Sequence, residues 1–115
     1  MRMNVSFNGI GDKLVTFLNN GAEKGEVVKV SAAGTVAPCS DDDVFDGVAV
    51  FVDGGYAGVR LRGFVTVSYS GAAPSVGHSL LLADGSGGVA VDNSDGRDYL
   101  VVDVDTTAKT ATILM

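Results

Sequence analysis

The stretch that most constrains the fold is residues 47–71, where three extended runs are separated by glycines. Valine occupies every second position of the first run, at Val48, Val50 and Val52, and side chains two positions apart share one face of a β-strand. The Asp-Gly-Gly cluster at residues 53–55 is typical of a tight turn, because glycine adopts positive φ without steric cost. The two later runs are rich in β-branched and aromatic residues, so the stretch predicts antiparallel strands and a hairpin.

The composition indicates one small all-β domain. The chain has 115 residues, a length natural for one domain, and 46% of them are hydrophobic, enough to bury a core. Its 16 glycines are about twice the ordinary share of ~7%, so many tight turns are expected. We predict a small antiparallel β-barrel or sandwich with little helix over residues 14–115, preceded by an N-terminal arm or edge strand at residues 1–13.

Further short strands are expected outside the central block. Residues 14–18 have features of both a helix and a strand, and the Val-Thr-Phe run at residues 15–17 favours the strand. The other predicted strands lie at residues 26–30, 34–37, 78–82, 88–92, 99–105 and 110–115, the last two forming a hairpin. Six apolar residues are expected to face the core: Val59, Leu61, Val65, Val67, Val102 and Val104. Six polar residues would face solvent: Arg60, Arg62, Thr66, Ser68, Asp103 and Asp105.

The chain also contains an internal echo with an offset of 52 residues. The segment that begins at Gly25 matches the segment that begins at Gly77, and Val36 matches Val89 one residue further on. Later matches join Val48, Val50 and Val52 to Leu100, Val102 and Val104, then Val59 and Leu61 to Ile113 and Met115 after two added residues. Either short β-strands resemble one another by chance, or the chain holds two copies of one unit that pack their apolar faces together.

The charge pattern disfavours two classes of partner. The net charge is −6, and the eight basic residues are scattered, so direct binding to nucleic acid or to an anionic membrane is not expected. Cys39 is the only cysteine, which excludes an intrachain disulfide. The first residues lack the apolar core of a secretion signal, and no apolar run approaches the ~20 residues of a membrane span. We expect a soluble product made in the cytoplasm.

Three polar motifs have the residue types of a chemical site without its pattern. The aspartates at residues 41–43, with Asp46, lack the glycine and glutamate spacing of a helix–loop–helix calcium site, which favours a solvated acidic loop or a short helical turn. His78 and Cys39 are too few for zinc and lack the orienting partner of a nucleophilic pair. Residues 84–88 lack the lysine of a phosphate-binding loop, so a hairpin turn is favoured there. No cofactor, metal site or enzymatic activity is predicted.

The succession of glycine- and valine-containing pieces resembles that of the small phage capsid cement proteins, also called head decoration or capsid-stabilising proteins. The matching pieces are AEKGEVVKV from residue 22, DGVAV from residue 46, AGVRLRGFVTV from residue 57, APSVGHSL from residue 73, and the closing strand at residues 110–115. Each piece alone has low specificity, and their order and spacing carry the resemblance.

The resemblance implies a non-enzymatic β protein of the virion. It would assemble as a homo-oligomer, typically a trimer, on the outer capsid surface and would clamp subunits of the major capsid protein. The candidates for the contact between an N-terminal arm and the shell are Met3, Val5, Phe7 and Ile10. The candidates for the contact between copies are Phe51, Tyr56, Arg60, Arg62 and Tyr69.

The alternative is a tail or fibre accessory module that binds carbohydrate or a host surface. Such a module needs an exposed aromatic platform, for which the available residues are Tyr56, Tyr69, Tyr99, Phe51 and Phe64.

Overall fold

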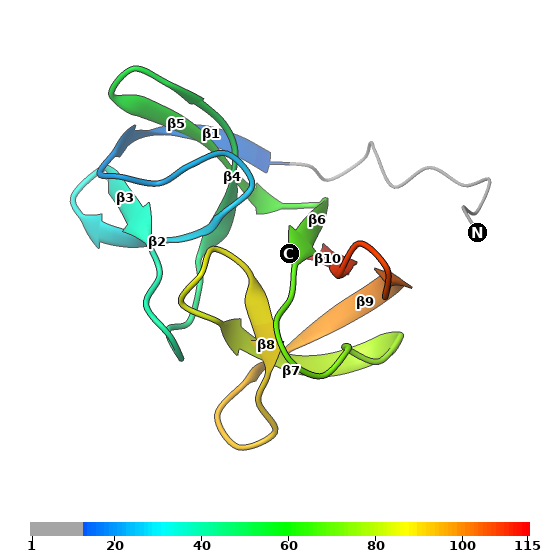
Figure 1. The fold of residues 1–115 in the computed structure, drawn as a ribbon. Helices are drawn as coiled ribbons and strands as arrows, with labels where there is room; N and C mark the ends of the chain where they lie inside the picture. Colours follow the sequence, from blue (N-terminus) through cyan, green and yellow to red (C-terminus); the bar gives the residue numbers. More distant parts are fainter. Residues whose placement is uncertain (1–12) are drawn as a thin grey trace.

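Ten β-strands and no helix make up the part of the chain that the structure describes, residues 13–115 of a computed structural model (Figure 1). The strands are β1 (Lys13–Asn19), β2 (Val27–Ala32), β3 (Thr35–Pro38), β4 (Gly47–Asp53), β5 (Tyr56–Arg62), β6 (Phe64–Ser68), β7 (Gly77–Ala83), β8 (Val89–Val91), β9 (Arg97–Asp105) and β10 (Thr110–Leu114). The predicted all-β class is confirmed, including the strand rather than a helix at residues 14–18.

The strands form two units of five, joined at Gly63. The first unit, β1 to β5, is a closed barrel with the strand order β1-β3-β2-β4-β5, in which β1 pairs antiparallel with β5 and briefly parallel with β3. The second unit, β6 to β10, is a five-stranded sheet with the order β6-β10-β9-β7-β8. Its two outer strands meet only through a parallel bridge between Tyr69 and Val89. The second unit thus repeats the connectivity of the first, with a much shorter closing pair.

The hairpin registers show that the repeat is a property of the fold. Ala49 pairs with Val59 in the β4–β5 hairpin, and Val101 pairs with Ile113 in the β9–β10 hairpin, which reproduces the offsets of 52 and 54 residues predicted from the sequence. The β2–β3 and β7–β8 pairs instead match at 53 residues in both strands, since Val30 pairs with Val36 and Ala83 with Val89. The predicted offset of 52 for β2 and β7 is therefore wrong by one residue.

The larger hydrophobic core is shared between the two units. Val27, Phe45 and Val48 come from the first unit and are buried against residues of the second. Phe45 stacks on Tyr99 with ring centroids 4.9 Å apart. The other buried members of this cluster are Cys39, Val65, Val67, Tyr69, Leu81, Ala83, Val89, Val101, Ala111 and Ile113. A smaller cluster lies within the first barrel and contains Ala22, Val28, Val36, Ala49, Ala57 and Val59.

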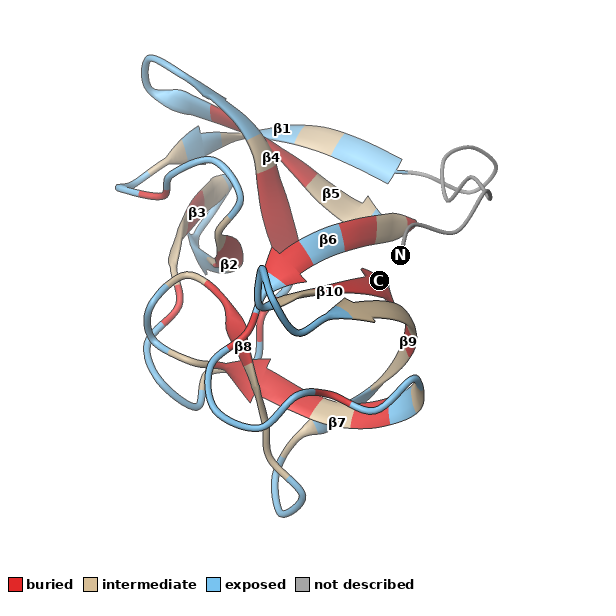
Figure 2. Cartoon of the chain, turned by 45° about the vertical axis from the view of Figure 1, so that its right-hand side comes forward, coloured by how far each residue is buried: buried red, intermediate tan, exposed pale blue. Residues whose placement is uncertain are grey.

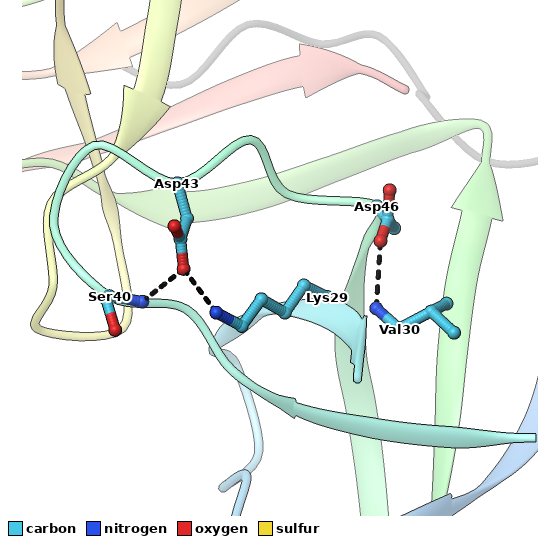
Figure 3. Close-up of polar contacts among 5 residues, drawn as sticks. All are labelled: Lys29, Val30, Ser40, Asp43 and Asp46. Carbon is cyan, nitrogen blue, oxygen red and sulfur yellow. Dashed lines mark hydrogen bonds and ion pairs between the residues drawn. The ribbon is translucent and has the colours of Figure 1, made fainter. Parts of the chain in front are cut away.

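The loop at residues 39–46 ties the first unit to β7. The Asp42 amide donates to the Ala83 carbonyl and the Ala83 amide donates to the Asp43 carbonyl, each at 2.9 Å. The Asp43 carboxylate accepts hydrogen bonds from Lys29 Nζ at 2.6 Å and from the Ser40 amide at 2.8 Å (Figure 3). These bonds lower the pKa of Asp43, and the same contact raises the pKa of Lys29. The predicted acidic loop is confirmed, without a helical turn.

The predicted inward and outward faces are correct in most places. Along β6, Val65 and Val67 are buried while Thr66 and Ser68 are exposed, an alternation visible in Figure 2. In β9 the prediction is wrong by one position, because Val101 is fully buried and Val102 is only half-buried. The β9–β10 register breaks beside Val102, and this β-bulge moves the inward positions by one residue.

Candidate functional site

The most distinctive surface of the described residues is an exposed apolar face on the first unit. Four large side chains form it, and we call it the apolar face: Leu14 and Leu18 from β1, Phe51 from β4 and Tyr56 from β5. Their exposed fractions are 49%, 49%, 42% and 55%. In Figures 1 and 2, β1 and the projecting β4–β5 hairpin lie together at the edge of the molecule. Large exposed apolar side chains gathered on neighbouring strands mark a candidate interaction surface.

The strand register places these four side chains beside one another. Leu18 lies directly opposite Tyr56 in the antiparallel β1–β5 pair. Phe51 lies opposite Gly58 in the β4–β5 pair, and a Cβ atom at Gly58 would collide with its ring. The absence of a side chain at Gly58 therefore lets the aromatic ring lie flat against the strand. Opposed side chains in such pairs stand roughly 4.5–5.5 Å apart, so Leu18, Tyr56 and Phe51 form one continuous patch.

Charges of opposite sign lie at the two ends of the apolar face. Lys13 pairs with Arg62 at the end where β1 begins, and both side chains are exposed. Asp53 is exposed at the opposite end, in the turn of the β4–β5 hairpin. Arg60 lies near the basic end, where it is half-buried and donates from Nη1 to the Phe64 carbonyl oxygen at 2.9 Å. The face thus runs from a basic end to an acidic end.

The second unit provides an internal comparison for this face. The β6–β10 and β9–β10 registers place three polar residues at the positions of three apolar ones: Ser68 for Leu18, Thr110 for Tyr56 and Asp103 for Phe51. Thr112 replaces Gly58 and shares a hydrogen bond of 2.9 Å with Thr66. Leu14 keeps an apolar counterpart, Phe64. The same backbone therefore forms with polar residues at most of these positions, so the apolar side chains on the first unit are not required by the fold.

The structure gathers most of the residues predicted for contacts between copies. Phe51, Tyr56 and Arg62 are exposed on the apolar face, and Arg60 lies on the same side of the sheet. The prediction for Tyr69 is wrong, because its side chain is only 5% exposed and belongs to the shared core. The aromatic platform of the alternative hypothesis also loses Tyr69, which leaves Tyr56 and Phe51 as its exposed pair.

Sequence reasoning missed Leu14 and Leu18 as surface residues. The alternation of Leu14, Thr16 and Leu18 could have placed them on one face of β1, but nothing in the sequence showed that this face points to solvent. The candidates for the shell contact, Met3, Val5, Phe7 and Ile10, lie outside the described residues.

The polar candidates do not assemble into a reaction centre in residues 13–115. The side chain of His78 is 71% exposed, and its Nδ1 lies 3.1 Å from an oxygen of Asp98. Cys39 is buried, and desolvation raises the pKa of its thiol to about 11. In residues 84–88 the Asp84 carboxylate accepts hydrogen bonds from the amides of Ser86 and Gly88, as in a polar turn. The described residues contain no group of three His, Cys, Asp or Glu side chains placed to hold a metal ion.

Comparison with known proteins gives no relative for this chain. No protein-family model matches it, and no curated protein sequence matches it either. Among residues 13–115 there is no helix with the length and apolar character needed to cross a membrane.

Proposed function

We propose that this chain is a capsid cement protein of a bacteriophage or prophage, which acts by binding the outer surface of the capsid shell as a homo-oligomer. The proposal joins the resemblance of residues 14–115 to that family with a fold of the expected all-β class. Its function would be to hold neighbouring subunits of the major capsid protein together.

The observation that carries the proposal is the apolar face on a rigid β body. Leu18, Phe51 and Tyr56 expose large apolar surfaces, where the second unit has serine, aspartate and threonine on the same backbone. Exposed apolar groups that the fold does not need are typical of a protein that acts through contacts. The net charge of −6 agrees with a shell protein that avoids nucleic acid.

Binding to capsid shells tests the proposal. The full chain is mixed with precursor shells and with expanded shells built from the major capsid protein of the same phage or prophage, and the shells are pelleted. We expect saturable binding to expanded shells, at a fixed ratio to the capsid subunit, and little binding to precursor shells. Failure to pellet with either kind of shell would contradict the proposal.

A second candidate is a carbohydrate-binding accessory module of a phage tail or fibre. Tyr56 is 55% exposed and Phe51 is 42% exposed on the same face, and exposed aromatic rings are the surfaces on which sugar rings stack. A glycan array would test this candidate with the wild-type chain and the Tyr56→Ala variant. A signal that the variant loses would support carbohydrate binding, and silence across the array would count against it.

A further inference from the structure

We infer that the apolar face binds the same face of a second copy of this chain, with the two copies related by a two-fold axis through the face near Phe51. The inference deepens the proposed function and rests on its assignment of this face as an interaction surface, because it names the partner that the face takes. It differs from what the resemblance implies, since a two-fold contact makes pairs of copies and not threes.

The charges at the two ends of the face identify the partner. Lys13 and Arg62 mark one end, and Asp53 marks the other. When two such faces meet in opposite directions, the basic end of each copy lies against the acidic end of the other. A two-fold axis produces this contact twice, as expected for the self-complementary surface of a symmetric dimer. A head-to-head arrangement would instead oppose like charges, which costs free energy.

The apolar residues lie where such an axis needs them. Phe51 lies against Gly58 near the middle of the face, with the Leu18–Tyr56 pair toward Asp53 and Leu14 toward Arg62. In the opposed arrangement, the Leu18–Tyr56 pair of one copy covers Leu14 of the other, and the two Phe51 rings meet at the centre. The contact therefore has an apolar centre and a charged rim, which is the ordinary anatomy of a protein interface.

The size of the face predicts a weak contact. Three strands of about seven residues, at ~3.3 Å per residue and ~4.8 Å between strands, cover roughly 300 Å² on each copy. A standard stable interface buries about 800 Å² on each partner. Association should therefore depend strongly on concentration in solution, and binding to a shell would favour the pair by holding copies close together.

Sedimentation equilibrium up to about 1 mM tests the apolar part of the contact. The test variant carries Leu18→Ser and Tyr56→Thr, which are the residues that the second unit has at the equivalent positions. The control is Val76→Ser, which removes a side chain that is 69% exposed in the connection between β6 and β7. We expect a monomer–dimer equilibrium for the wild type and the control, and association at least tenfold weaker for the test variant. A strictly monomeric wild type, a trimer, or an unchanged test variant would overturn the inference.

Exchanging the charges tests the two-fold arrangement without changing the apolar residues. Asp53→Lys and Arg62→Glu should each weaken association of the single variants, because each places like charges together twice. An equimolar mixture of the two variants should associate about as well as the wild type, since both charged contacts are then complementary. A mixture that associates no better than the single variants would overturn the proposed orientation. Shell pelleting with the same proteins separates the two proposals, because shell binding without pairing leaves only the proposed function standing.

Discussion

Val50 and Val102 occupy the same position in two copies of one hairpin. Each lies in a register break, between Ala49 and Phe51 in the first unit and between Val101 and Asp103 in the second. Such β-bulges bend a strand and increase its twist, which helps a short sheet to curl toward a barrel. The duplication therefore includes the device that curves the sheet, and the two units differ mainly in how far they close and in what their outer faces carry.

The shared core predicts that the two units unfold together. Phe45→Ala removes a ring that is 3% exposed and stacks on Tyr99 of the other unit. We expect a loss of about 3–5 kcal/mol in the free energy of unfolding, the range measured for large aromatic truncations in cores. The neighbouring Val44→Ala substitution is the matched control, because Val44 is 37% exposed. Urea unfolding followed by tyrosine fluorescence and by circular dichroism should give one coincident transition, whereas two separated transitions would show that the units are independent.

Gly88 should be essential for closing the second unit. A Cβ atom at Gly88 would collide with the carbonyl oxygen of Ser68, next to the Tyr69–Val89 bridge that joins β6 to β8. Gly88→Ala is therefore expected to lower the free energy of unfolding by about 1–3 kcal/mol, as overpacking commonly does. Gly55→Ala is the control, because no atom lies within 4 Å of its added Cβ. Equal stability of the two variants in thermal unfolding would show that the second unit tolerates a wider opening.

The Lys29–Asp43 contact predicts a specific dependence of stability on pH. The pKa of Asp43 is lowered by its bonds to Lys29 and Ser40, so its contribution is present above its ordinary range near 3.8 and is lost as pH falls. The pKa of Lys29 is raised by Asp43, so its contribution is present below 10.5 and is lost as pH rises. Asp43→Asn keeps an acceptor for Ser40 and should flatten the acid side of the stability profile. Lys29→Met should flatten the alkaline side.

The control for this charge removal is Lys24→Met, on an exposed residue. Urea midpoints measured across the pH range should be lower for the two single variants than for the wild type at neutral pH. The Asp43→Asn and Lys29→Met double variant should be more stable than the sum of the two single losses predicts, because the two residues act as one contact. Additive losses would mean that the ion pair contributes nothing measurable, which is common at exposed sites.

Cys39 should be almost unreactive while the chain is folded. Its side chain is buried, and the pKa of the thiol is raised to about 11, chiefly by desolvation. At pH 8 only on the order of one thiol in a thousand would be ionised, and the thiolate is the reactive species. Iodoacetamide labelling should be at least 100-fold slower in the folded chain than in urea. Comparable rates in the two conditions would contradict this burial.

The sequence predicts the β class, most strands and the duplication, because alternating valines and punctuating glycines act locally. It does not predict which residue of β9 turns inward, since the bulge at Val102 is set by pairing with β10. The burial of Tyr69 also depends on tertiary packing, because the chain leaves β6 there and crosses to β8. Leu14 and Leu18 look like core residues in the sequence, and only the completed barrel shows that they lie outside it.

The most direct test of the central claim is the stability of capsid shells with and without this chain. Expanded shells are heated alone, with a saturating amount of the wild-type chain, and with the variant carrying Leu18→Ser and Tyr56→Thr, and their disruption is followed by light scattering. The account predicts that the wild-type chain raises the disruption temperature and that the variant raises it less. An unchanged disruption temperature with the wild-type chain bound at saturation would contradict a capsid-stabilising function.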